Sequence, residues 1–285
     1  MRVVGLALWF VLSAAAAPPA DVARARILYQ HTDYQGALGE LLPLHAKTPA
    51  IYALVGESYF RIGDFKKSSD AFEKAVAGDP GNSEYIHWLG RAYGRRAESG
   101  NPFTAPGNAS KARRCFERAV ELDPRNFEAM NDLFDYYLEA PGFLGGGFQK
   151  AEALAKRIAE MDPAEGHYAQ AQLADKRKQF DAAEAQLRRA MELAPRQVGR
   201  ALDLAKYLAK RGRLQESEAV FDKAERMAPD SPKVMFERAR TYVKENRNLS
   251  QARSLLERYL ESNTTPEDPP KDKARELLKQ ARAGA

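Results

Sequence analysis

Apolar and polar positions along this chain follow the period of amphipathic helices, and the helices come in pairs. The first helix of a pair carries a small residue between two large ones, as in Tyr52, Gly56 and Tyr59. The second helix carries a large apolar residue three positions before an alanine, as in Phe72 and Ala75. Residues at these spacings share one helix face, so the pattern predicts paired helices that approach closely at the small residue.

Prolines follow this pattern at a regular distance. In four of the second helices a proline stands five positions after the alanine, at Pro80, Pro124, Pro195 and Pro229. Proline lacks an amide hydrogen and clashes with the preceding turn, so it ends each second helix. Pro195 and Pro229 lie 34 positions apart, which indicates a repeating unit of that length.

These positions resemble those of the tetratricopeptide repeat (TPR) family, whose unit is a helix–turn–helix of about 34 residues. The best examples are residues 49–82 and 198–231, where the unit closes without gaps. The resemblance implies an all-α fold, a right-handed α-solenoid of antiparallel helix pairs that forms a TPR superhelix. Because each unit packs only on its neighbours, such an array needs no single large core.

We predict a TPR array over residues 17–268 and a C-terminal capping helix within residues 269–285. The array contains seven units, which span residues 18–48, 49–82, 83–126, 127–163, 164–197, 198–231 and 232–265. The third unit exceeds the period by about ten residues and the fourth by about five. We expect surface loops around residues 99–108 and within residues 139–149. Three successive glycines in the second loop lack the Gly-Lys-Ser/Thr ending of a phosphate loop, so we interpret them as a connector.

The first 16 residues have the form of a secretory signal peptide. Arg2 precedes an apolar run over residues 3–12, and small residues follow. We expect cleavage after Ala16, which would place the mature protein in the periplasm or outside the cell without membrane insertion. The alternative is an uncleaved segment that anchors the chain in the inner membrane, although the run is shorter than the ~20 residues that a spanning helix needs.

Charge and reactive side chains narrow the possible functions. The 44 basic and 39 acidic residues give a net charge of +5 and are interleaved. A nucleic-acid partner is therefore not expected, because such proteins carry a clustered basic stripe. Cys115 and the four scattered histidines show no metal-binding spacing and no catalytic set. We expect no cofactor, no metal and no enzymatic activity, and Cys115 is expected to pack as a small apolar side chain.

The resemblance also implies a binding surface, because the first helices of TPR units line a concave groove that receives peptides or helices. The candidate groove residues are His87, Trp88, Arg91, Arg95, Asn131, Asp132 and Asp135. The first four form a cationic and aromatic face that could bind a carboxylate or an aromatic side chain. In the other interpretation, Trp88 packs against a neighbouring unit and the arginines are solvated. The acidic residues either bind Lys or Arg of a partner or pair with a neighbouring unit.

The sequence therefore predicts a non-catalytic scaffold or adaptor that binds a peptide or helix of an envelope partner in the concave groove. The alternative is a structural subunit of a larger envelope or secretion complex, and an enzyme is less favoured than either. No sequence signal indicates an oligomeric state.

Overall fold

The computed structural model describes residues 20–283, and the predicted signal peptide lies outside them. Within these residues the chain forms fifteen α-helices, one short 3₁₀ helix and no β-strand. The helices are α1 Ala20–Gln30, α2 Tyr34–Leu41, α3 Pro49–Arg61, α4 Phe65–Gly78, α5 Ser83–Ser99, α6 Ala105–Leu122, α7 Phe127–Glu139, η1 Gly142–Leu144, α8 Phe148–Met161, α9 Pro163–Lys176, α10 Phe180–Leu193, α11 Val198–Lys210, α12 Leu214–Met227, α13 Pro232–Lys244, α14 Leu249–Glu261 and α15 Lys271–Ala283.

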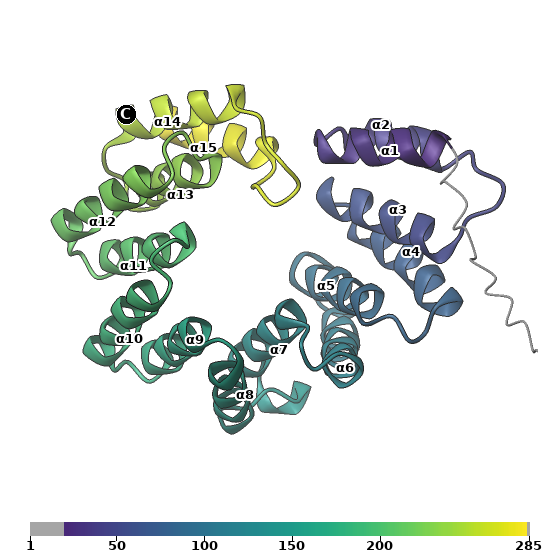
Figure 1. Cartoon of the computed structure of the whole chain (residues 1–285), viewed down its shortest axis with the longest axis horizontal. Helices are drawn as coiled ribbons and strands as arrows, with labels where there is room; N and C mark the ends of the chain where they lie inside the picture. Colours follow the sequence, from purple (N-terminus) through teal and green to yellow (C-terminus); the bar gives the residue numbers. More distant parts are fainter. Residues whose placement is uncertain (1–19, 284–285) are drawn as a thin grey trace, which may run out of the picture.

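Consecutive helices pack as antiparallel pairs, and the pairs stack into an arc (Figure 1). Helices α5, α7, α9 and α11 lie on the inside of the arc, and α6, α8, α10 and α12 lie on the outside. The last helix, α15, packs against α14 and α13. The predicted all-α solenoid is confirmed. None of the helices in the described part of the chain is long and apolar enough to span a membrane.

Local signals define where the helices begin. The turn between α3 and α4 contains Gly63 at a φ of 86°, a left-handed conformation that glycine adopts without steric cost. The carboxylate of Asp64 then accepts a hydrogen bond from the Lys67 amide at 3.0 Å, which caps α4. Asn82 and Asn126 cap α5 and α7 in the same way, so each of these inner helices starts at a fixed point after its proline.

In the second and third pairs, the glycine of the first helix and the aromatic residue of the second meet as the pattern predicts. A Cβ atom added to Gly56 would lie 2.7 Å from the ring of Phe72, and one added to Gly90 would lie 2.6 Å from the ring of Phe116. Both rings are buried, at 0% and 6% exposure. The two helices of a pair therefore approach so closely that only hydrogen fits at the glycine.

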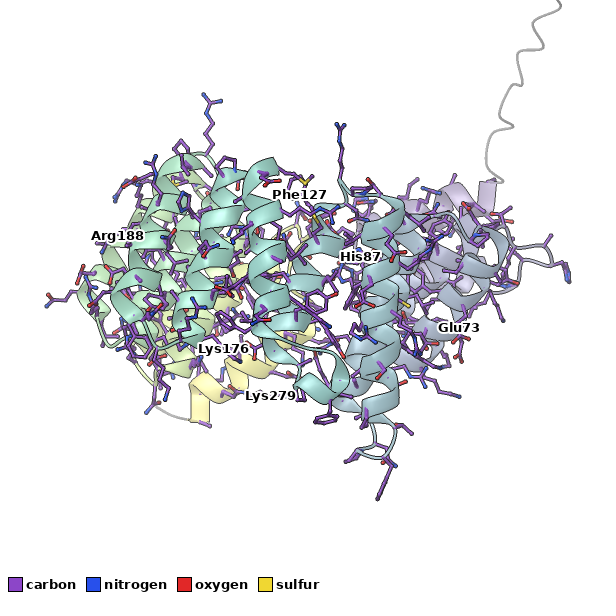
Figure 2. All side chains as sticks on the ribbon, turned by 90° about the horizontal axis from the view of Figure 1, so that it is seen from below. Glu73, His87, Phe127, Lys176, Arg188 and Lys279 are labelled. Carbon is purple, nitrogen blue, oxygen red and sulfur yellow. The ribbon has the colours of Figure 1, made fainter. Side chains whose placement is uncertain are left out.

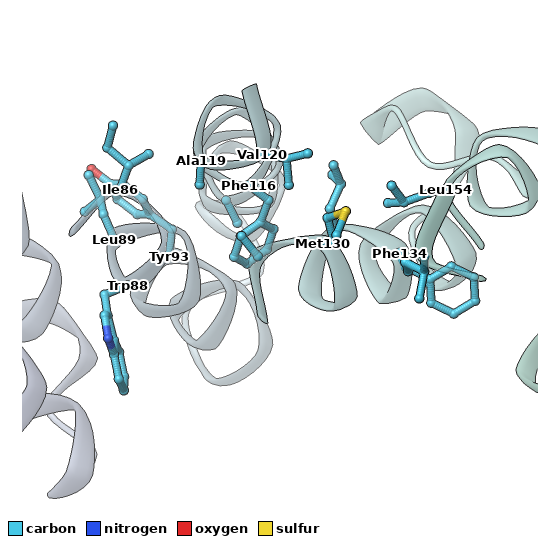
Figure 3. Close-up of a cluster of buried hydrophobic side chains, with 14 of the residues drawn as sticks. Ile86, Trp88, Leu89, Tyr93, Phe116, Ala119, Val120, Met130, Phe134 and Leu154 are labelled. Carbon is cyan, nitrogen blue, oxygen red and sulfur yellow. The ribbon is translucent and has the colours of Figure 1, made fainter. Parts of the chain in front are cut away.

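The buried side chains form a series of clusters along the arc. The most extensive cluster contains residues from α3 through α9, with Phe116 between the helices of the third pair and Met130 and Phe134 on the next inner helix (Figure 3). Further clusters lie at α1–α4, around α9–α11, around α11–α13 and at α13–α15. Each neighbouring pair thus covers the apolar face of the one before it.

The extra residues of the third unit differ from the loop that we expected over residues 99–108. Helix α5 continues to Ser99 and α6 begins at Ala105, so the two helices have 17 and 18 residues and the connector is only residues 100–104. Pro106 lies in the first turn of α6, where an amide hydrogen is not needed, and it therefore starts the helix instead of ending it. We call residues 94–109 the extended hairpin. Figure 2 shows it projecting beyond the ends of neighbouring helices.

The two ends of the array face each other across the open side of the arc (Figure 1). Both ends line one cavity of about 220 Å³, to which the first units contribute Thr32, Tyr34 and Arg61 and the C-terminal segment contributes Asp268, Lys271 and Arg275. The arc is therefore nearly closed in this conformation.

The close helix approach predicts opposite effects for two Gly→Ala substitutions. Gly90→Ala should lower the free energy of unfolding by about 1–2 kcal/mol, because the displaced Phe116 ring outweighs the gain in helix propensity. Gly39→Ala, at an exposed helical site with no atom within 4 Å of the added Cβ, should raise it by about 0.5–1 kcal/mol. Urea unfolding of both variants measures the difference. Stabilisation by Gly90→Ala would contradict this packing.

Candidate functional site

An open cleft of about 720 Å³ lies between the third and fourth helix pairs, and Phe60 of the second pair also lines it. Its walls are α5 and the extended hairpin on one side and α7 with the following loop on the other. We call it the inter-unit cleft. The apolar lining includes Phe60, Ala97, Pro102, Ala109, Phe116 and Leu144, and the charged lining consists of Arg91, Arg95, Glu98, Asp132, Asp135 and Glu139.

Both irregular segments of the sequence line this one cleft. The extended hairpin contributes Pro102 and Pro106, and the loop after α7 contributes Pro141 and Leu144. The Tyr136 hydroxyl donates a hydrogen bond to the Leu144 carbonyl at 2.9 Å, which holds the loop against α7. The sequence indicated both inserts but not that they line the same cleft. The signal that could have indicated the shared cleft is that the inserts occur in consecutive units, which are neighbours in space.

The three glycines after η1 build a fixed connector. Gly145 has a φ of 88°, and a Cβ added to Gly146 would lie 1.8 Å from the Ala140 carbonyl oxygen. The amides of all three glycines donate to backbone carbonyls, at 2.9 Å, 3.3 Å and 2.8 Å for residues 145, 146 and 147. These amides are therefore engaged inside the loop, which agrees with the connector interpretation and leaves no cradle for a phosphate.

His87 and Trp88 are buried behind the residues that line the cleft and do not line it themselves. His87 is 2% exposed, and its Nε2 atom lies 2.7 Å from Oδ2 of Asp132. Trp88 is 8% exposed and stacks on Phe72 at a centroid distance of 5.9 Å, while its edge meets Phe60. Trp88 thus packs against the preceding unit, as one of the two interpretations expected, and His87 positions a carboxylate.

Arg91 and Arg95 reach the cleft, but both already have partners. The Arg91 guanidinium lies 4.3 Å from the Trp88 ring centroid, and its Nε atom is 3.7 Å from Oδ2 of Asp132. Arg95 pairs with Glu98 and lies 5.1 Å from the ring centroid of Phe65. A ligand carboxylate would have to compete with these internal anions for either arginine.

The acidic candidates lie on α7, opposite the arginines. Asn131 donates a hydrogen bond to Glu165 at 3.2 Å and so connects α7 to α9. Asp132 lies between His87 and Arg91. Asp135 lines the cleft, and no Lys, Arg or His nitrogen of residues 20–283 lies within 4.0 Å of its carboxylate. The predicted groove residues therefore come together, with Asp135 as the acidic group that lacks an ion pair.

The environment of Asp135 disfavours its charged form. Its side chain reaches solvent, but the surrounding concave wall limits its hydration. This loss of hydration and the neighbouring Asp132 carboxylate raise the pKa of Asp135 from 3.8 to about 6, against a hydrogen bond from Gln172 that lowers it. Because the side chain remains exposed, the effect on stability is smaller than the pKa alone implies.

A second cavity, of about 450 Å³, lies farther along the inner side, between α9, α11 and α13. Its cationic lining is Lys206, Lys210, Arg240 and Lys244. Lys210 pairs with Asp175 at 2.8 Å and Lys206 with Asp203 at 3.1 Å, so most of this charge is compensated inside the chain. This cavity lacks an insert at its rim, and we place the candidate site at the inter-unit cleft.

The described residues hold one free cysteine and no cluster of potential metal ligands. Cys115 is partly buried, and burial raises the pKa of its thiol to about 11, so the thiol is protonated at neutral pH. No group of three or more potential metal ligands occurs within residues 20–283. The cleft thus offers apolar surface, several ion-paired side chains and the carboxylate of Asp135.

Two segments of the chain match family models described as tetratricopeptide repeat, over residues 49–82 and 168–232. A solved tetratricopeptide repeat protein from Parabacteroides merdae has a TM-score of 0.58 and 16% identity, with 92% of this chain and 97% of that one covered. A thermophilic TPR protein of Thermus thermophilus has a TM-score of 0.53 and 21% identity, with 66% and 97% covered. No curated protein sequence matches the chain.

The fold is an α-solenoid with a concave inner face that carries the inter-unit cleft. The matching segments make the assignment more specific: residues 49–82 and 168–232 are tetratricopeptide repeats, and the array has the fold of tetratricopeptide repeat proteins. Arrays of such repeats serve in general as scaffolds for protein–protein interaction, and this chain has that general character.

The raised pKa of Asp135 predicts a gain in stability when its charge is removed. Asp135→Asn should raise the free energy of unfolding at pH 7.5 by about 0.5–1 kcal/mol, after allowance for solvent screening. The gain should be complete above pH 6 and shrink towards pH 3.8, because over that range the native carboxyl binds its proton more tightly than the unfolded one. Urea unfolding from pH 4 to 8 measures the effect, and a gain independent of pH would exclude this cause.

Proposed function

We propose that the protein is a non-catalytic scaffold that binds a peptide or helical segment of an envelope protein in the inter-unit cleft. The main support is that both inserts of the chain line one cavity of about 720 Å³. This volume falls within the range of roughly 300–1,000 Å³ that is typical of ligand sites. The non-catalytic assignment rests on the TPR fold, which usually serves as an interaction module.

The composition of the cleft favours a polypeptide ligand. Prolines, alanines and Leu144 provide apolar surface, and the charged side chains lie around it. The walls of the cleft are rigid, which also favours ligand binding. The extended hairpin is helical almost to its tip, and the opposite loop is held by backbone hydrogen bonds. A preformed site loses less conformational entropy on binding than a flexible one.

Two exposed aromatic side chains support the alternative of a subunit in a larger complex. Phe103 is 95% exposed at the tip of the extended hairpin, and Phe143 is 83% exposed on η1. Aromatic residues in such positions are enriched at protein interfaces. This alternative predicts copurification with a partner at fixed stoichiometry, whereas an adaptor binds its ligand reversibly.

Filling the cleft tests the proposed function. Ala109 lines the cleft, and Ala109→Trp should weaken the binding of peptides selected against the wild-type protein by at least tenfold, because the indole occupies their site. Lys223→Trp, at an exposed position of the outer helix α12, is the matched control and should leave binding unchanged. Fluorescence anisotropy with labelled peptides measures both affinities. Equal affinities for all three proteins would contradict binding in the cleft.

The proposed location in the envelope rests on residues 1–16 of the sequence. Expression of the full chain in a bacterial host should yield a periplasmic protein whose amino terminus is Ala17, as determined by mass spectrometry of the intact protein. An intact protein that retains residues 1–16 and sediments with the membrane fraction would instead support the uncleaved anchor.

A further inference from the structure

The carboxylates around the inter-unit cleft are almost all paired with cations. Glu139 pairs with Lys176 at 2.7 Å, and Glu165 pairs with Arg200 at 3.0 Å. Asp132 lies between His87 and Arg91. Asp135 stands in the same row on α7, and within the described residues it alone among these four has no cation within 4.0 Å. Asp135 is therefore a carboxylate at the cleft surface that has no cationic partner within the described residues.

The other charged groups that face Asp135 do not supply that charge. On α5, Arg91 is shared between Asp132 and Glu128, and Arg95 is paired with Glu98. On α9 and α11, Lys176 and Arg200 are engaged with Glu139, Glu165 and Asp203. Carboxylates thus outnumber cations around Asp135, and the neighbouring Asp132, Glu139 and Glu165 all act to raise its pKa. This field attracts a cation and repels a carboxylate.

The apolar part of the cleft lies directly beside this carboxylate. Tyr136 follows Asp135 on α7, and both line the same cavity as Pro102 and Leu144. A bound segment therefore meets an apolar surface and an unpaired carboxylate within one site. A peptide with an apolar side chain close to a Lys or Arg presents the complementary pair of groups.

We propose that the inter-unit cleft selects segments in which an apolar side chain lies within one helical turn of a Lys or Arg, whose cation pairs with Asp135. This inference rests on the proposed function and specifies its ligand. It reverses the charge preference that the arginines of α5 suggested, because those arginines already have anionic partners. A ligand with a carboxylate in this place is therefore disfavoured.

The same geometry makes recognition dependent on pH. A ligand cation binds the deprotonated form of Asp135, so binding lowers the pKa of this carboxyl and releases its proton. Since the pKa of Asp135 in the free protein is about 6, the affinity for a basic segment should fall as the pH decreases from 7.5 to 5. A neutral segment of the same shape should not show this dependence.

Selection from a library of random decapeptides tests the proposal. Each decapeptide is fused at both ends to flanking sequence, so that it carries no terminal charge. The wild-type protein at pH 7.5 should enrich peptides that combine an apolar residue with Lys or Arg within four positions. Asp135→Asn should still enrich the apolar residue but lose the basic one. Glu160→Gln is the matched control, since Glu160 is exposed on the outer helix α8 and does not line the cleft, and it should select the wild-type pattern.

Affinities of the enriched basic peptides should fall at least fivefold from pH 7.5 to pH 5 with the wild-type protein and less than twofold with Asp135→Asn. Enrichment of acidic residues, or the same basic enrichment with Asp135→Asn, would overturn the proposal. Enrichment of apolar residues alone would overturn it while leaving the proposed function intact. If Ala109→Trp selects the same peptides as the wild-type protein, the proposed function itself fails, because the cleft is then not the binding site.

Discussion

The contact of a glycine with an aromatic ring inside a helix pair is the constraint on which the rest of this structure depends. At Gly90 the ring of Phe116 occupies the space of a missing side chain, and Gly56 and Phe72 repeat the arrangement one unit earlier. In these two pairs the contact sets how closely the two helices approach, and Ala205 with Phe221 occupies the corresponding positions in a later pair. Because neighbouring pairs then bury the remaining apolar faces, a regular local contact becomes an arc with an inner and an outer side.

A repeated architecture of this kind tolerates inserts where a compact domain would not. Extra residues in the third unit extend α5 and α6 in the direction of their own axes and leave the glycine contact in place. Extra residues in the fourth unit fold into a short loop that is held by Tyr136. Since consecutive units are neighbours in space, two inserts in consecutive units become the two walls of one cleft, and the repeat supplies its base.

The sequence predicts the parts of this structure that depend on local spacing. Helix pairing, the close approach at Gly56 and Gly90 and the ends at the prolines all follow from residues within one unit. The burial of Trp88 and the pairing of Arg91 with Asp132 depend on the distance between α5 and its neighbours, which no periodicity within one helix specifies. The expected loop over residues 99–108 is mostly helical in the structure, because Pro106 lies in the first turn of α6, where a proline is tolerated.

The central claim is that the cleft between the third and fourth units receives a segment of a partner protein. Site-specific photo-cross-linking in the native host cell tests it most directly, with the reactive residue placed either at Ala97, which lines the cleft, or at Lys223 on the outer helix α12. The account predicts a discrete cross-linked partner from Ala97, competed by selected peptides, and none from Lys223. Cross-linking from Lys223 with none from Ala97 would contradict it.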